Sequence, residues 1–204
     1  MSKFKKNEPL YNGLIIILGV VIIGFGVAVL LRAGLGTDPF TCLNIGFSKL
    51  TGLSFGTCQL ITNIVILSVP LIYSRKSIGF GSIANMVLVG YSADFFNFLF
   101  TYLPEKSPVE EFLLMIIGIL VCSYGVAMYM EGNMGVAPYD ALSIIISKKF
   151  NKNYGFVRMV QDLICVIIGY LLGGTVGIST VLTALVMGYI INYYRPKIHH
   201  FFFE

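Results

Sequence analysis

Long apolar stretches separated by short polar ones organise the whole chain. A helix needs about 20 apolar residues to cross roughly 30 Å of hydrocarbon. Six stretches approach or exceed that length, over residues 11–31, 55–73, 80–103, 112–130, 155–172 and 176–194. The pattern predicts an all-α membrane protein with six spanning helices.

Two shorter segments, residues 39–50 and 138–150, lie between these stretches and are too polar to be further spans. Asp38 before Pro39 is typical of a helix N-cap followed by proline at the first helical position. A helix of roughly 12 residues is about 18 Å long, which is too short to cross the membrane. We therefore expect two half-helices, starting at Pro39 and Pro138, that are either re-entrant or interfacial.

The two halves of the chain form an internal repeat. A shift of 99 positions aligns Gly36 with Gly135 and Pro39 with Pro138, and after one deletion a shift of 98 aligns Gly79 with Gly177. Ordered glycine and proline punctuation of this kind does not arise from apolar composition alone. The sequence predicts one polytopic domain over residues 1–204, with repeats at about 11–103 and 112–196.

Equivalent loops of the two repeats differ in charge, which indicates opposite orientations in the membrane. The basic residues Lys3, Lys5 and Lys6 precede the first repeat, whereas the acidic loop 105–111 precedes the second. Arg75 and Lys76 correspond to the uncharged residues 173–175, and Lys49 alone corresponds to Lys148, Lys149 and Lys152. No basic residue directly follows the end of the first repeat, whereas Arg195 and Lys197 follow the end of the second. Arg32 opposes the trend, and a bare count of basic residues does not separate six spans from eight. We expect two inverted repeats of three transmembrane helices plus one short half-helix each (3+3), with both termini cytoplasmic.

Composition adds few chemical possibilities. The chain is 56% hydrophobic and 12% charged, and its net charge of +4 comes mainly from basic residues at the ends of apolar stretches. That placement encodes orientation and argues against nucleic-acid binding. The four cysteines are widely spaced, the His199–His200 pair has no acidic or cysteine neighbour, and no acid–base–nucleophile set can be assembled. We expect no metal, no cofactor and no enzymatic activity.

Polar groups at membrane depth are costly and are therefore functional candidates. The substrate-binding candidates are Asp38, Thr41, Asn44, Gln59, Asn63, Asp94, Asp140, Arg158 and Asp162. Asp38 reads more readily as an N-cap than as a ligand. Arg158 and Asp162 are four residues apart, a spacing that permits an ion pair within one helix, although Arg158 could instead extend to the membrane surface. Asp94 fits a cavity and an interfacial position equally well.

Several motifs resemble the YczE/YyaS/YitT family of bacterial integral membrane proteins. The similarity lies in the run 32–40, its continuation at 53–57, and the later segments 79–85 and 90–94, and it extends over nearly the whole chain. The resemblance implies a bacterial plasma (inner) membrane location. It implies no substrate and no catalytic or ligand residues.

These observations favour a small secondary transporter or permease for a small solute or ion, with its site between the two half-helices. The paired helix N-termini slightly favour an anionic group, whereas Asp38 argues for the opposite charge. Hinge candidates are Gly79, Gly81, Gly173 and Gly177. The alternative is a non-transporting membrane partner, such as a regulatory or substrate-capturing subunit of a larger complex, and a lipid-handling role ranks third. Besides the lipid bilayer and the solute, a second copy in a homodimer is an expected partner.

Overall fold

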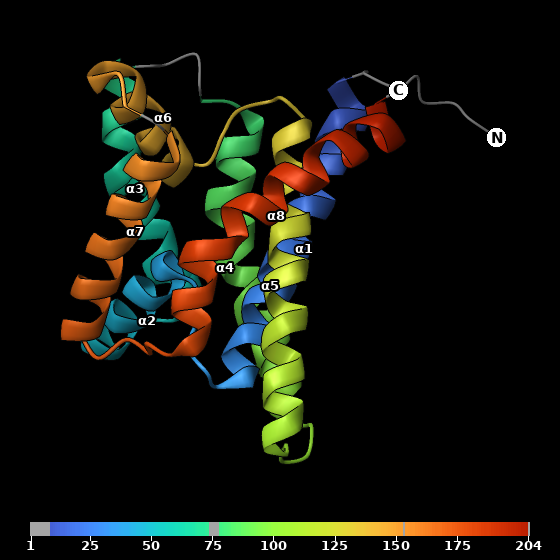
Figure 1. The fold of residues 1–204 in the computed structure, drawn as a ribbon, viewed down its shortest axis with the longest axis vertical. Helices are drawn as coiled ribbons and strands as arrows, with labels where there is room; N and C mark the ends of the chain where they lie inside the picture. The colour runs from blue at the N-terminus through green and yellow to red at the C-terminus, as the bar shows by residue number, and fades with distance from the viewer. Residues whose placement is uncertain (1–8, 74–77, 153, 204) are drawn as a thin grey trace.

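Eight α-helices account for nearly all of the chain that the computed structural model describes, which is residues 9–73, 78–152 and 154–203 (Figure 1). No strand occurs within those three ranges. The helices are α1 (Pro9–Ala33), α2 (Pro39–Thr51), α3 (Phe55–Tyr73), α4 (Phe80–Phe100), α5 (Pro108–Glu131), α6 (Pro138–Phe150), α7 (Tyr154–Leu171) and α8 (Ile178–Phe203). The predicted all-α class is confirmed. The basic residues Lys3, Lys5, Lys6, Arg75 and Lys76, which entered the orientation argument, lie outside the described residues.

Four helices, α1, α3, α4 and α5, are long and apolar enough to cross a membrane. The other two predicted spans coincide with α7 and α8, which are not among these four candidates over the described residues. The polar side chains of α7 gather in its first half, at Arg158, Gln161 and Asp162, and α8 carries Arg195 and Lys197 towards its end. Six spans and their inverted arrangement therefore stay a prediction.

Local chemistry places the ends of both half-helices. The Asp38 carboxylate accepts a hydrogen bond from Thr41 N at 3.1 Å, so its expected role as the N-cap of α2 is confirmed. At the other end Gly52 takes a left-handed φ of 72° and donates its N–H to Ser48 O, as C-terminal glycines commonly do. In α6 the left-handed residue is Asn151, and the residue before Pro138 is Ala137, which has no capping side chain.

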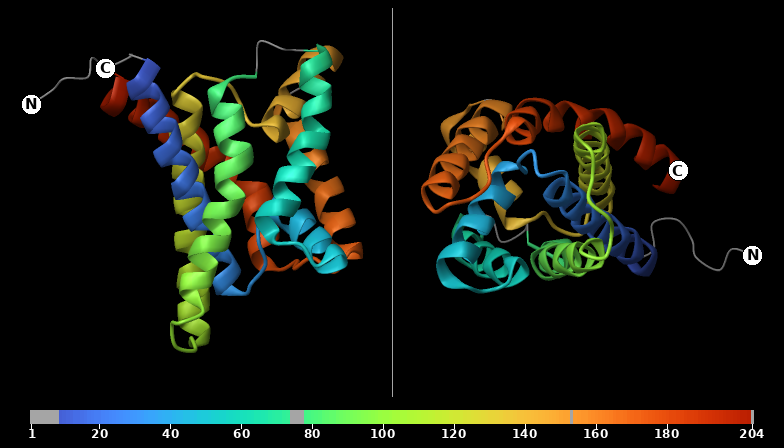
Figure 2. Two further views of the ribbon diagram at one scale, coloured as in Figure 1. Left: turned by 180° about the vertical axis from the view of Figure 1, so that it is seen from behind. Right: turned by 90° about the horizontal axis from the view of Figure 1, so that it is seen from below.

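The helices pack in two groups (Figure 2). In the first, α1 packs against α4 and α5, and α8 crosses α5 obliquely. In the second, α2 packs against α7 and α3 against α6, so each half-helix lies against a long helix from the other half of the chain. The contact between α3 and α4 joins the groups. This exchange of partners brings the starts of α2 and α6 together.

Glycines allow α1 and α5 to approach closely. A Cβ on Gly26 would lie 2.6 Å from Cys122 Sγ and 2.8 Å from its backbone nitrogen, and one on Gly125 would lie 2.7 Å from Gly19 O. Contacts this close between helices are typical of small residues in membrane proteins, where packing replaces the hydrophobic effect. The buried side chains of Val20, Leu30 and Met115 belong to the core around this contact.

The Gly26→Ala variant should lower the free energy of unfolding by about 1–3 kcal/mol, because the added methyl forces α1 and α5 apart. The matched control is Gly188→Ala, where a Cβ would meet nothing within 4 Å and the better helix former should gain up to about 1 kcal/mol. Thermal unfolding in lipid nanodiscs measures both. Equal melting temperatures for the two variants would contradict the tight α1–α5 contact.

The loop before each half-helix contacts the start of a long helix from the other half of the chain: the loop before α6 contacts α4, and the loop before α2 contacts α8. Gly81 N donates to Met134 O at 2.7 Å, and Ser179 N donates to Leu35 O at 2.9 Å. Gly79 and Gly177 flank these bonds and lack the Cβ that would strike the same carbonyls. Three of the hinge candidates, Gly79, Gly81 and Gly177, thus lie at close backbone crossings, while Gly173 takes a φ of 85° after α7. A hinge function for them stays a prediction.

Candidate functional site

The first turns of α2 and α6 meet near the middle of the second helix group. The rings of Phe40 and Tyr139, each directly after the helix-starting proline, lie 4.5 Å apart between centroids and are tilted by 31°. Pro39 and Pro138 are both buried. The sequence predicts a solute site between these two prolines. In the structure the starts of the two half-helices are neighbours.

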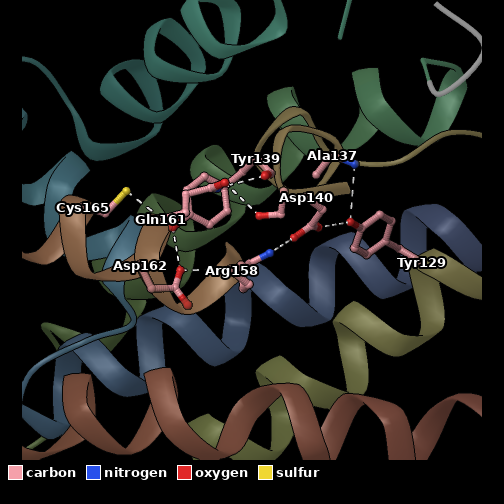
Figure 3. Close-up of polar contacts among 9 residues, drawn as sticks. Tyr129, Ala137, Tyr139, Asp140, Arg158, Gln161, Asp162 and Cys165 are labelled. Carbon is pink, nitrogen blue, oxygen red and sulfur yellow. Dashed lines mark hydrogen bonds and ion pairs between the residues drawn. The ribbon is translucent and has the colours of Figure 1, made fainter. Parts of the chain in front are cut away.

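A buried ion cluster lies beside this contact, formed by Asp140 on α6 and by Arg158 and Asp162 on α7 (Figure 3). Arg158 Nη1 pairs with Asp140 Oδ1, and Arg158 Nε lies 3.3 Å from Asp162 Oδ1. The carboxylate side chains are only 12% and 10% exposed, whereas that of Arg158 is 29% exposed. The ion pair that the four-residue spacing allowed is present, and Asp140 from a different helix completes it.

Two tyrosines donate hydrogen bonds to the same two carboxylates. Tyr129 OH, from α5, donates to Asp140 Oδ2 at 2.5 Å and accepts from Ala137 N at 3.4 Å. Tyr139 OH donates to Asp162 Oδ1 at 2.6 Å, and its ring lies 4.5 Å from the guanidinium carbon of Arg158. Tyr129 thereby ties the cluster to the first helix group. Sequence reasoning assigned no role to either tyrosine, although Tyr139 aligns with the aromatic Phe40 of the first repeat, a signal that could have drawn attention to it.

Gln161 extends the network towards the interior of α6. Ser143 Oγ donates to Gln161 Oε1 at 2.8 Å, and Gln161 Nε2 donates to Tyr139 O at 3.0 Å. These bonds hold α6 against α7, so the cluster is positioned by a rigid contact between two helices.

Asp38 adds a third carboxylate to this region. It is half-buried, it caps α2, and it is close enough to Asp162 for the two charges to interact. With Asp38, Asp140 and Asp162 against Arg158, carboxylates outnumber the guanidinium by three to one. Asp38 and Asp140 already place a carboxylate at the positive N-terminal end of each half-helix dipole. The helix N-termini therefore no longer favour an anionic solute.

The equivalent residues of the first repeat form an uncharged, deeply buried polar set, namely Thr41, Asn44, Gln59 and Asn63. Asn44 Nδ2 donates to Phe40 O at 2.8 Å, and Asn63 Nδ2 donates to Gln59 O at 3.0 Å. The Oδ1 atoms of both asparagines are buried without a hydrogen-bond partner among the described residues. A buried acceptor left in this state costs free energy, and such atoms are available to a ligand or to water.

Asp94 lies elsewhere. Its Oδ2 accepts a hydrogen bond from Gly56 N at 2.8 Å, at the first turn of α3, and so joins α4 to α3. Of the nine substrate-binding candidates, the structure thus pairs Asp140 and Asp162 with Arg158, places Asp38 near Asp162, and places Asp94 at a helix–helix contact. Within residues 9–73, 78–152 and 154–203, no three His, Cys, Asp or Glu side chains group closely enough to hold a metal ion.

Comparisons with known proteins agree on a membrane family. The chain is 28% identical over 194 residues to the uncharacterized membrane protein YczE of Bacillus subtilis, covering 94% of this chain and 89% of the relative. It is 25% identical to the protein YyaS of the same organism, covering 91% and 92%, and 26% identical to an uncharacterized protein of Haemophilus influenzae, covering 88% and 81%. No solved structure matches the chain significantly.

The resemblance to YczE and YyaS seen in the sequence is therefore confirmed. The relatives and the apolar helices agree that this is an integral membrane protein. The family model described as a family of unknown function, DUF6198, matches residues 10–196, which is most of the chain. The chain belongs to the DUF6198 family.

Proposed function

We propose that the chain is a small secondary transporter whose solute site lies where the half-helices α2 and α6 meet. The observation that carries the proposal is the contact between Phe40 and Tyr139 beside the buried Asp140–Arg158–Asp162 cluster. Transporters built from repeats bind solutes where interrupted or short helices begin near the middle of the membrane. Buried charges in a bilayer are rare, and in such proteins they mark ion and substrate pathways.

Matching contacts in the two halves support inverted repeats. The bond from Gly81 N to Met134 O and the bond from Ser179 N to Leu35 O join equivalent positions of the two repeats, shifted by 98 and 99 residues. In Figure 1 α1 and α5 run in opposite directions, as do α3 and α7, while α2 lies towards the lower end and α6 towards the upper end. Inverted repeats produce this relation between equivalent helices.

Charge supports an orientation with both termini in the cytoplasm. The start of α1 and the end of α8 lie at the same end of the molecule, where Tyr11 and Phe203 are in ring contact. The end of α6, whose last turn carries Lys148 and Lys149, and the last part of α8, whose sequence includes Arg195 and Lys197, lie towards that end. At the opposite end the dissenting Arg32 donates to Phe100 O at 2.8 Å and Pro104 O at 2.7 Å, so carbonyls at the end of α4 and beyond compensate its charge. The inner bacterial membrane is the expected location.

The surplus of carboxylates favours a small cation as the solute, or a proton as the coupling ion. Neutralising part of this negative charge would stabilise the desolvated cluster. Movement of the second helix group against the first would then expose the site to each side in turn. Tyr129 belongs to the first helix group and donates to Asp140 in the second. A change in the charge of the ion cluster would therefore reach the first helix group through this hydrogen bond.

Proteoliposomes containing the purified protein and an internal pH-sensitive dye test this function. We expect an inward gradient of sodium, potassium, ammonium or tetramethylammonium to drive a proton flux that empty liposomes lack. Asp140→Asn and Asp162→Asn should lower the rate at least tenfold, by analogy with the size of single electrostatic contributions at functional sites. The control is Glu105→Gln, which removes a carboxylate from the exposed loop before α5 and should transport normally.

Absence of flux with every cation, together with a stoichiometric membrane partner that co-purifies with the chain, would overturn the proposal. That result would favour the alternative, a non-transporting subunit of a larger complex.

A further inference from the structure

An apolar groove lies between α3 and α7 and is backed by α2 and α6. Its volume is about 800 Å³, within the range of small-molecule sites. Equivalent side chains of the two repeats line it in pairs, among them Leu43 with Leu142 and Val65 with Ile164. The ion cluster lies behind one wall, since the groove-lining Tyr139 donates to Asp162 of the cluster and accepts at its backbone oxygen from Gln161, which also lines the groove.

The groove opens towards the hydrocarbon of the bilayer. Val65 and Ile164, one on each rim, are 67% and 52% exposed in the isolated chain. From Phe156 to Ile168 the α7 wall rises about 18 Å at 1.5 Å per residue, slightly more than one leaflet of a hydrocarbon core of roughly 30 Å. An empty groove would forfeit dispersion contacts along its whole lining, so an acyl chain of one leaflet fits its shape and its chemistry.

Charge is distributed unequally along the groove. Lys152 lines one end, and Lys148 and Lys149 are exposed nearby at the end of α6. The position equivalent to Lys152 in the first repeat is Leu53, which lines the groove without a charge. Apolar packing against lipid tails gives little selectivity by itself, because lipid tails are as apolar as the side chains. Any selectivity for a lipid headgroup would therefore come from the lysine end.

We propose that this groove is a binding site for one anionic phospholipid, with an acyl chain between α3 and α7 and its phosphate at Lys152. A basic residue near the membrane surface favours an acidic lipid by about five-fold in affinity. The lipid would pack directly against Tyr139 and Gln161, and so against the residues that hold the ion cluster. This inference does not depend on transport.

The absence of tryptophan from the chain allows a direct test. Phe156→Trp places a fluorophore in the groove beside Lys152, and Leu163→Trp places one on the same helix at an exposed position outside the groove. Each variant is reconstituted in phosphatidylcholine, and quenching is measured on adding phosphatidylglycerol or phosphatidylcholine with brominated acyl chains. At the Phe156→Trp site, phosphatidylglycerol should bind about five-fold more tightly than phosphatidylcholine, whereas the Leu163→Trp site should show no preference.

Adding Lys152→Gln to Phe156→Trp should abolish the preference, while Lys197→Gln, which removes a lysine from the same end on α8, should leave it unchanged. Equal quenching by the two lipids at the Phe156→Trp site would overturn the proposal. The proposal would also be overturned if neither brominated lipid quenched the Phe156→Trp fluorescence. That result would show that protein, such as a second copy of the chain, covers the groove.

Discussion

Replacing Arg158 with methionine is expected to lower the free energy of unfolding by about 3–5 kcal/mol, because it leaves Asp140 and Asp162 as buried charges without their cation. The two carboxylate side chains are 12% and 10% exposed, so water cannot replace the guanidinium. The stack of Arg158 on the Tyr139 ring is lost as well. Thermal or denaturant unfolding in nanodiscs, followed by circular dichroism, measures the change.

The matched control is Arg195→Met on α8. The Arg195 side chain is 43% exposed, and its partner Glu131 retains His199 at 2.9 Å, so the cost should be about 1 kcal/mol or less. Arg158→Met combined with Asp140→Asn and Asp162→Asn should recover most of the stability, since no unpaired charge remains. A mild effect of Arg158→Met, or no recovery in the triple variant, would contradict the view that the cluster is an electrostatically coupled unit.

Helix boundaries were predictable because the residues that set them act locally. The N-cap at Asp38 and the prolines at positions 39 and 138 were visible in the sequence, and the structure begins α2 and α6 at those prolines. Residues 138–150 were predicted as the second half-helix, and α6 covers the same range. A cap or a helix-starting proline needs only its own neighbours along the chain, so one sequence suffices.

The composition of the site was only partly predictable. The Arg158–Asp162 pair follows from helical spacing, but the pairing of Arg158 with Asp140 requires knowing that α6 packs on α7. Tyr129 lies eleven residues before Asp140 on a different helix, and no local pattern marks it as a donor to that carboxylate. Asp94 shows the converse: its place in the sequence fitted a cavity and an interfacial position equally well, and only the fold shows that its hydrogen bond joins α3 and α4.

The second large effect is expected at Gly177 and Gly79. Gly177→Val and Gly79→Val should each lower the free energy of unfolding by about 2–4 kcal/mol, since overpacking and a lost backbone hydrogen bond add together. A Cβ at Gly177 would lie 2.2 Å from Leu35 O, and one at Gly79 would lie 2.4 Å from Met134 O. These carbonyls accept the bonds from Ser179 N and Gly81 N, so relieving the clash breaks the link between each half-helix connection and the helix that it crosses.

The comparison of the two variants tests the repeat as well as the packing. If the halves are inverted copies, Gly79→Val and Gly177→Val should be destabilised to a similar extent, because the carbonyls lie at equivalent positions. Gly188→Val, at a glycine whose added Cβ meets nothing within 4 Å, controls for the replacement of a glycine by valine where no backbone carbonyl is struck. The opposite result would be a large loss of stability in one variant and a wild-type melting curve in the other. It would show that only one backbone crossing holds its half-helix in place. The half-helix starts at Phe40 and Tyr139 would then be held by different contacts.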